Sequence, residues 1–162
     1  MNIAADLQKA KNKYKENKYL MEKLGRIKRR ELDELFFRIH EEVFSEIDCM
    51  ECGNCCKNTG PKINNRDIDR IGNFINMRSG KVRQAYLKVD DDNEFVFQSM
   101  PCPFLKEGNV CSIYEVRPRA CSEYPYTDIP NIQKKLYKTL KNSLICPGVY
   151  RILERIKEEL KK

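Results

Sequence analysis

DCMECGNCCKN, residues 48–58, places four cysteines within eight consecutive positions. Cys49, Cys52 and Cys55 repeat at intervals of three residues, and Cys56 follows directly on Cys55. A CxxC spacing lets two thiolates converge on one ion, while the intervening backbone N–H groups point at the sulfurs and offset their charge. The stretch therefore predicts an irregular, cysteine-rich centre that binds metal and around which the rest of the chain packs.

The composition of the chain indicates a soluble domain in which cysteine has a chemical role. The 162 residues are 41% hydrophobic, which is enough for a core without crosslinks, and they include eight cysteines. The sequence contains no apolar run of the length that a signal peptide or a membrane span needs. We therefore expect a cytoplasmic protein without a membrane partner. In a reducing cytosol, clustered cysteines bind metal more often than they pair as disulfides.

Positive charge is concentrated near the two ends of the chain. The net charge is +7; residues 9–30 carry 10 basic and 2 acidic residues, and residues 132–162 carry 9 and 3. The simplest interpretation is that these charges lie on solvated faces of helices. The alternative is that they contact nucleic acid or an unknown protein partner. No aromatic recognition motif accompanies them.

Residues 1–47 are predicted to form a basic, amphipathic, helical N-terminal extension. Apolar residues recur there at helical spacing, namely Leu32, Leu35, Phe36, Ile39, Val43, Phe44 and Ile47. This pattern predicts one long helix that runs up to the cysteines. Leu20 and Leu24 extend it upstream, although Gly25 weakens the helix. His40, the single histidine, is expected at the surface or edge and not among the metal ligands.

Residues 48–150 are predicted to form a cysteine-cluster metal-binding domain. Asn65 is expected to cap a short helix there, and residues 95–97 to form a short strand. The loop that follows Cys102 bends the chain, so that a hairpin can bring Cys102 and Cys111 together.

The last part of the chain predicts further helices after an irregular connection. Three prolines lie in residues 113–130, which therefore cannot form one regular helix. Helical periodicity returns from Ile132 as two helices or one broken helix, and residues 151–162 are predicted to pack on the domain as a C-terminal helix. The predicted fold class is mainly α, with helices packed around an irregular cysteine-rich metal-binding centre and at most a short hairpin.

The cysteine pattern is compatible with an iron–sulfur cluster and with zinc. The CxxCxxC run resembles the start of the bacterial ferredoxin pattern for [4Fe–4S] clusters, but Thr59 stands where the fourth cysteine would be. Cys102 and Cys146 each precede a proline and could supply a remote ligand. Zinc is the rival, because eight cysteines suffice for two closed sites with four thiolate ligands each. The candidate metal ligands are Cys49, Cys52, Cys55, Cys56, Cys102, Cys111, Cys121 and Cys146.

The doubled cysteine indicates two sulfur environments. Adjacent side chains diverge in an extended segment and lie about 100° apart around a helix, so Cys55 and Cys56 are not expected to ligate one small ion together. In the simplest division, Cys49, Cys52 and Cys55 share one site with a remote cysteine. Four of Cys56, Cys102, Cys111, Cys121 and Cys146 then form a second site or remain structural thiols.

The order of these motifs resembles a known family. CMECGNCC, CPFLKEGNVCSIYEVRPRACSEYP and CPG, within residues 48–150, are similar to the CxxCxxCC cysteine-cluster family, also called YkgJ-like and described as a zinc- or iron-chelating domain. The resemblance places all eight cysteines at family positions, with Tyr114, Arg117, Pro118 and Pro125 completing the middle motif. It implies binding of zinc or of an iron–sulfur cluster.

Three functions follow from these patterns. The first is metal binding by cysteine thiolates without an assigned reaction, with Arg117 hydrogen-bonding backbone carbonyls or offsetting thiolate charge beside Cys121. The second is an enzyme, either related to the flagellin lysine N-methylases or performing cluster-linked redox chemistry, although no Gly-rich loop marks a site for S-adenosylmethionine. The third is a zinc-stabilised module that binds nucleic acid or protein through its basic ends. No catalytic residue is assigned.

Overall fold

The structure, a computed structural model, describes residues 2–161 in two compact units. Unit 1 comprises residues 1–48 and 125–162, and unit 2 comprises residues 49–124. The two ends of the chain therefore fold together in unit 1, and the sequence between them forms unit 2. The predicted division into residues 1–47, 48–150 and 151–162 stays a prediction.

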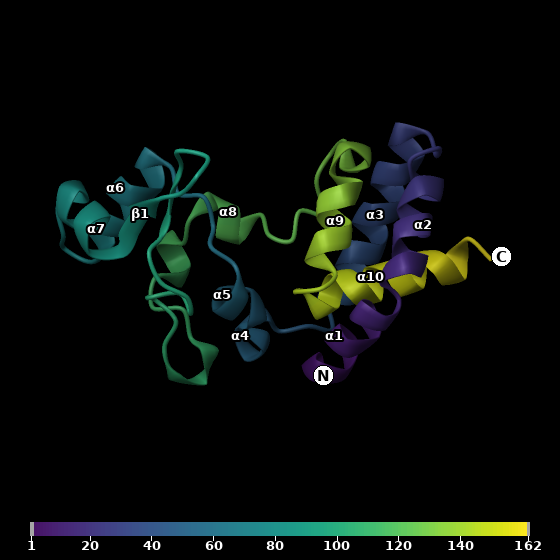
Figure 1. Ribbon diagram of the computed structural model, residues 1–162, viewed down its shortest axis with the longest axis horizontal. Helices are drawn as coiled ribbons and strands as arrows, with labels where there is room; N and C mark the ends of the chain where they lie inside the picture. The colour runs from purple at the N-terminus through teal and green to yellow at the C-terminus, as the bar shows by residue number, and fades with distance from the viewer. Residues whose placement is uncertain (1, 162) are drawn as a thin grey trace. The chain divides into compact units, whose positions relative to one another are not determined.

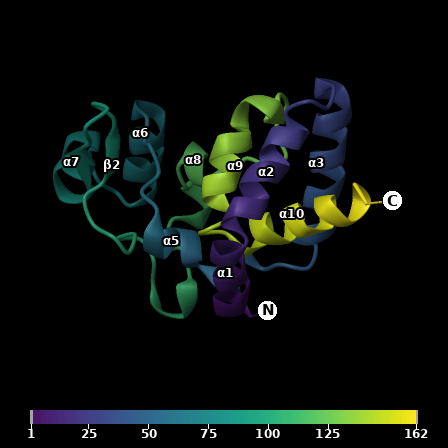
Figure 2. The same cartoon turned by 45° about the vertical axis from the view of Figure 1, so that its right-hand side comes forward.

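The predicted mainly α fold class is confirmed. Unit 1 is helical throughout its regular elements, which are α1 (Ile3–Asn12), α2 (Tyr14–Leu24), α3 (Arg29–Phe44), η3 (Ile132–Lys135), α9 (Leu136–Asn142) and α10 (Pro147–Glu159). Purple and blue helices from the N-terminal segment lie beside yellow-green helices from the C-terminal segment in both ribbon views (Figures 1 and 2). In the described residues, no helix combines the length and the apolar character that crossing a membrane requires.

The core of unit 1 follows directly from the helical periodicity. Leu32, Phe36 and Ile39 of α3 are at most 1% exposed, and they pack with Leu153 and Ile156 of α10 in one cluster. Burial of each such side chain contributes about 1.5–3 kcal/mol. Ion pairs join the helices around this core, for example Arg151 to Asp6 and Lys157 to Glu16.

One prediction for the N-terminal segment needs correction. The apolar stripe does not continue as one helix, because α2 ends at Leu24 and α3 begins only at Arg29, after the break that starts at Gly25. His40, which was expected at the surface or edge, is partly buried: its side chain is 12% exposed. It stacks on Phe44, with ring centroids 4.4 Å apart, and its Nδ1 lies 2.8 Å from Oγ1 of Thr127. The predicted C-terminal pair of helices is confirmed as α9 and α10.

Unit 2 consists of short elements. They are α4 (Cys49–Cys52), α5 (Asn54–Asn58), α6 (Asn65–Phe74), α7 (Ser79–Tyr86), β1 (Leu87–Val89), β2 (Phe95–Phe97), η1 (Glu107–Asn109), η2 (Tyr114–Val116) and α8 (Arg119–Ser122). The strands β1 and β2 pair antiparallel, with Leu87 opposite Phe97. The predicted strand at residues 95–97 is therefore confirmed, and so is the irregular proline-rich connection. The partner strand β1 and helix α7 were not predicted.

The cap of α6 lies one residue earlier than predicted. Oδ1 of Asn64 accepts a hydrogen bond from the N–H of Asp67 at 2.9 Å, and Oδ2 of Asp67 accepts one from the N–H of Asn64 at 3.2 Å. This reciprocal pair is a capping box, and it satisfies two N–H groups that a helix start leaves without intrahelical partners. Asp67 lies three residues after Asn64 and completes the box with it, so the cap is Asn64 and not Asn65.

A small apolar core holds unit 2 together. Its buried members are Ile63, Ile68, Ile71, Val82, Leu87, Phe97, Phe104 and Ile113. Phe104 lies at its centre, with its ring centroid 5.5 Å from that of Phe97 and 4.7 Å from that of Tyr86. Cys102 and Cys111 pack against this cluster from the same segment of chain. The core therefore fixes the backbone that carries two of the candidate ligands.

Candidate metal centre

The turn between α4 and α5 sets the path of the first four cysteines. Gly53 has a φ of +54°, in the left-handed region where residues with a Cβ are strained. A Cβ at this position would lie 2.8 Å from Cβ of Asn109 in η1. Nδ2 of Asn109 also donates a hydrogen bond to the carbonyl of Glu51 at 2.8 Å. The CxxCxxCC segment is therefore held closely against the loop that precedes Cys111.

The predicted hairpin around Cys102 and Cys111 is confirmed. Leu105 and Cys111 form an antiparallel bridge, and the N–H of Lys106 donates to the carbonyl of Val110 at 2.8 Å. The N–H of Cys102 donates to the carbonyl of Cys56 at 2.8 Å, which joins this hairpin to the end of the cysteine run. Three cysteines from two separate segments thus lie on hydrogen-bonded backbone.

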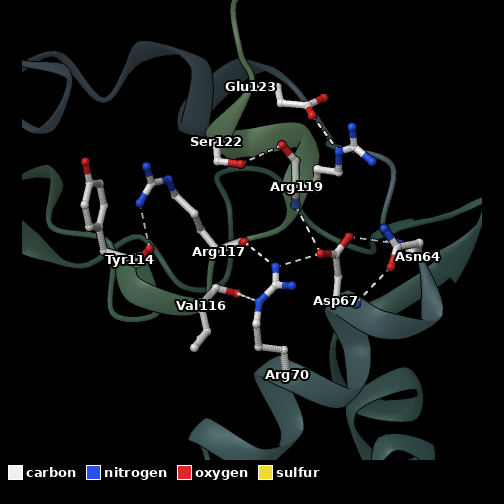
Figure 3. A network of polar contacts seen from close by, with 9 residues as sticks. All are labelled: Asn64, Asp67, Arg70, Tyr114, Val116, Arg117, Arg119, Ser122 and Glu123. Carbon is white, nitrogen blue, oxygen red and sulfur yellow. Dashed lines mark hydrogen bonds and ion pairs between the residues drawn. The ribbon is translucent and has the colours of Figure 1, made fainter.

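A buried carboxylate positions the segment that carries Cys121 (Figure 3). Asp67, whose side chain is 1% exposed, accepts a hydrogen bond from the N–H of Arg119 at 3.1 Å and one from Nη2 of Arg70 at 2.7 Å. Arg70 in turn donates to the carbonyls of Val116 and Arg117, at 3.4 and 2.8 Å. Side chains of α6 therefore hydrogen-bond to the backbone on both sides of Pro118. Cys121 follows on α8.

Arg117 acts on the backbone and on the thiols. Its Nη1 donates to the carbonyl of Tyr114 at 2.9 Å, and its guanidinium lies 4.0 Å from the centroid of the Tyr114 ring. Its positive charge also favours the thiolate forms of Cys111 and Cys121 and so acts to lower their pKa values, against burial. The predicted hydrogen bond from Arg117 to a backbone carbonyl is confirmed, and the offset of thiolate charge stays a prediction.

Four thiols of unit 2 interact electrostatically and are called here the thiol quartet: Cys56, Cys102, Cys111 and Cys121. Burial, and after it the neighbouring quartet sulfurs, raise the pKa of Cys121 to about 12 and that of Cys102 to about 11. The pKa of Cys111 is raised as well, first by burial and then by Cys56. As thiolates these groups would repel one another in a partly desolvated space, so a bound cation would favour their ionised forms.

Cys56 is the member of the quartet that ionises most readily. A hydrogen bond from the thiol of Cys55 lowers the pKa of Cys56 to about 7, although burial opposes the shift. The two Sγ atoms are 3.9 Å apart. The prediction that Cys55 and Cys56 point into separate surroundings is therefore wrong. Their side chains project from adjacent positions of α5, and their rotamers bring the sulfurs together despite the angle between the Cα–Cβ bonds.

The assignment of the remaining cysteines as metal ligands stays a prediction. Cys49 is exposed and Cys52 half-buried, both on α4, and Cys146 is the N-cap residue of α10 in unit 1. Within residues 2–161, no three His, Cys, Asp or Glu side chains are gathered as they would be around a metal ion. The quartet is thus defined by its electrostatic interactions, and its four soft sulfur donors fit zinc or iron by their chemistry.

Sequence reasoning missed three residues that position the quartet: Gly53, Asp67 and Asn109. The pattern Asn64-x-x-Asp67 could have revealed Asp67 as part of a capping box. Nothing local to the sequence indicates its hydrogen bond to Arg119, because 52 residues separate the partners. Gly53 and Asn109 are likewise brought together only by the tertiary fold.

A helical domain with an irregular, thiol-rich centre belongs to the class of small metal-chelating domains. A family model described as "CxxCxxCC: Putative zinc- or iron-chelating domain" matches residues 48–147. The chain belongs to this family of zinc- or iron-chelating domains, as its resemblance implied. The comparisons with curated proteins and with solved structures gave no match.

Proposed function

We propose that the thiol quartet of unit 2 ligates a [4Fe–4S] cluster, with a single zinc ion as the alternative occupant. The observation that carries this proposal is the hydrogen-bonded backbone that joins Cys56 to the hairpin of Cys102 and Cys111, with Cys121 on the connection that Asp67 holds; these thiols come from three separate segments of the chain. These four half-buried thiols form an all-sulfur donor set, and a bound cation would stabilise their thiolate forms.

One feature favours the cluster over zinc. Among the quartet, Cys102 precedes Pro103, and a remote cysteine followed by proline resembles the end of the ligand pattern of bacterial ferredoxins. The single histidine, His40, is largely buried in unit 1 on Thr127 and Phe44, so the ligand set that unit 2 offers is all-thiolate. Since zinc also accepts four thiolates, the donor set alone leaves the metal to experiment.

A bound cluster would supply one-electron transfer at a potential set by its surroundings. Arg117 would offset part of its negative charge, and the apolar core behind Cys102 and Cys111 would limit the access of water. A cytoplasmic location is part of the proposal, because reducing conditions keep the thiols available. We assign no reaction, and the alternative of lysine methyl transfer is supported only by the family relationship.

The test is metal and sulfide analysis of protein purified without oxygen, together with a visible absorption spectrum. We expect about four iron and four acid-labile sulfide per chain and a coloured protein. One zinc per chain in a colourless protein would show that the site holds zinc and not a cluster. Protein that binds neither metal, as isolated and after reconstitution, would contradict the proposal.

Single substitutions test which cysteines are ligands. Serine at any quartet position should remove most of the metal, whereas Ser122→Ala, next to Cys121, should leave the metal content unchanged. Cys49→Ser, Cys52→Ser, Cys55→Ser and Cys146→Ser should each retain it. If Cys49→Ser lost the metal and Cys121→Ser retained it, the assignment to the quartet would be wrong and the run at residues 49–55 would hold the site.

A further inference from the structure

Unit 1 carries a concentrated basic segment that metal binding in unit 2 does not use. Residues 132–142, which form η3 and α9, contain four lysines and no acidic residue. They are Lys134, Lys135, Lys138 and Lys141, all exposed. In the described part of the chain, Lys134, Lys135 and Lys141 have no carboxylate partner. Such a cluster attracts polyanions because its charge is not neutralised locally.

The same segment displays an aromatic ring. Leu136, Thr139 and Leu140 form the buried face of α9, which leaves Tyr137 and Lys141 on the opposite face. Tyr137 is 67% exposed, and Nζ of Lys141 lies 4.6 Å from the centroid of its ring. An exposed tyrosine beside a lysine offers a flat apolar surface next to a positive charge.

Helix α2 repeats this arrangement next to α9. The two helices pack against each other through Leu20, Leu136 and Leu140 (Figure 2). On the outer side of α2, Tyr19 is 59% exposed and Nζ of Lys23 lies 4.8 Å from the centroid of its ring. We call the exposed side chains of η3, α9 and α2 the basic face.

The acidic groups near the basic face are mostly engaged by other partners. Glu16 of α2 forms an ion pair with Lys157 at 2.7 Å. The carboxylate of Asp33 accepts hydrogen bonds from the N–H groups of Asn131 and Ile132, at 3.0 and 2.9 Å. Glu22 is exposed on α2 and subtracts one charge. The face remains positive, and η3 and α9 together are its most basic part.

We propose that the basic face binds single-stranded nucleic acid. Its lysines would contact phosphates, while Tyr137 and Tyr19 would stack on unpaired bases. An acidic polypeptide would match the charge but would leave two exposed rings without a stacking partner. A duplex would offer phosphates but keep its bases stacked inside. The pairing of rings with lysines on neighbouring helices therefore favours a single strand.

Fluorescence anisotropy with a labelled 20-nucleotide RNA of mixed sequence and no self-complementarity tests the proposal on the full, metal-loaded chain. We expect binding whose logarithm falls linearly with the logarithm of salt concentration. The triple variant Lys134→Gln, Lys135→Gln, Lys141→Gln should reduce that slope by about two, since each phosphate contact on a single strand contributes about 0.7. The matched control Lys81→Gln, Lys88→Gln, Lys106→Gln removes the same charge from unit 2 and should leave the slope unchanged.

Tyr137 distinguishes stacking from charge alone. Tyr137→Ala should weaken binding about tenfold or more, and Tyr137→Phe should preserve it, because the ring and not the hydroxyl stacks. Phe37→Ala, at a 56% exposed position on α3, is the control. Far-ultraviolet circular dichroism would verify that each variant is folded.

Three outcomes would overturn the proposal. The first is equal loss of binding in the two triple-lysine variants, which would indicate attraction by net charge only. The second is equal affinity for the RNA, its duplex and polyglutamate, with Tyr137→Ala binding as tightly as the parent; this would indicate a general polyanion surface. The third is the absence of RNA binding at low salt.

Discussion

The backbone N–H of Arg119 donates a hydrogen bond of 3.1 Å to the buried carboxylate of Asp67, 52 residues earlier in the chain. This contact fastens the start of α8 to α6 and fixes the place of Cys121 relative to the apolar core of unit 2. The same carboxylate caps α6 and pairs with Arg70. One side chain therefore connects the helix cap, the proline-rich connection and a quartet thiol.

Replacement of Asp67 by alanine should destabilise unit 2 and weaken metal binding together. The change leaves the N–H groups of Asn64 and Arg119 without their acceptor, and we expect a loss of about 2–3 kcal/mol in the free energy of unfolding. Urea unfolding and metal titration would measure the two effects. Asp91→Ala, in the exposed turn between β1 and β2, is the matched control and should change neither quantity. Equal effects of both substitutions would contradict the positioning role of Asp67.

Gly53 and Gly108 form a second matched pair. Both have positive φ, but a Cβ at Gly53 would meet Asn109 at 2.8 Å, whereas a Cβ at Gly108 would meet nothing within 4 Å. Each alanine substitution should cost about 1 kcal/mol of backbone strain. Gly53→Ala should cost about 1–3 kcal/mol more and lower the metal affinity, because the η1 loop must move away from α4. Chemical denaturation and metal competition would compare them, and equal losses in both would show that the contact with Asn109 does not matter.

The helical elements could be predicted because burial imposes a period on the sequence. Leu32, Phe36, Ile39 and Val43 revealed α3, and the aromatic run at residues 95–97 revealed β2. The residue at which a helix begins or ends depends on free-energy differences that are smaller than those of burying apolar side chains. The break after Leu24 and the choice of Asn64 as a cap were therefore misjudged by a few residues, since neighbouring caps differ by roughly 1 kcal/mol or less.

The sequence indicated the eight cysteines as candidate ligands and Arg117 as a residue that supports their backbone. It did not indicate which of the thiols interact with one another. Which cysteines interact depends on how α6 holds the proline-rich connection and how η1 meets α4, and both contacts join distant positions. The approach of the Cys55 and Cys56 sulfurs depends on side-chain rotamers, which spacing does not encode. Exposure of Tyr19 and Tyr137 likewise follows from which face of each helix is buried.

Removal of the metal should loosen unit 2 more than unit 1. Unit 2 relies on a small apolar core, and binding of metal by its thiols adds directly to its folding free energy. Unit 1 has its own larger core between α3 and α10. Hydrogen exchange of metal-free and metal-loaded protein should show lost protection at Ile68 and Ile113, with α3 unchanged, and restored protection when metal is returned. Uniform loss across both units would contradict this prediction.

Acidification should weaken unit 1 through His40. Burial lowers the pKa of His40 below its ordinary value, and the nearby carboxylates of Asp128 and Glu41 oppose that shift only in part. Because the folded pKa lies below the unfolded value of about 6.5, the unfolded chain binds more protons in mild acid. The stability that neutral His40 contributes is therefore complete above the unfolded pKa and is lost as the pH falls through the folded pKa.

Hydrogen exchange of the α3 amides between pH 7.5 and 5, corrected for intrinsic exchange rates, would measure this loss. His40→Gln removes the titrating group while keeping a side chain that can hydrogen-bond to Thr127, and it should flatten the dependence on pH. A parallel decline in the parent and in His40→Gln would assign the acid sensitivity to carboxylates. That outcome would contradict the prediction that protonation of His40 destabilises unit 1 in mild acid.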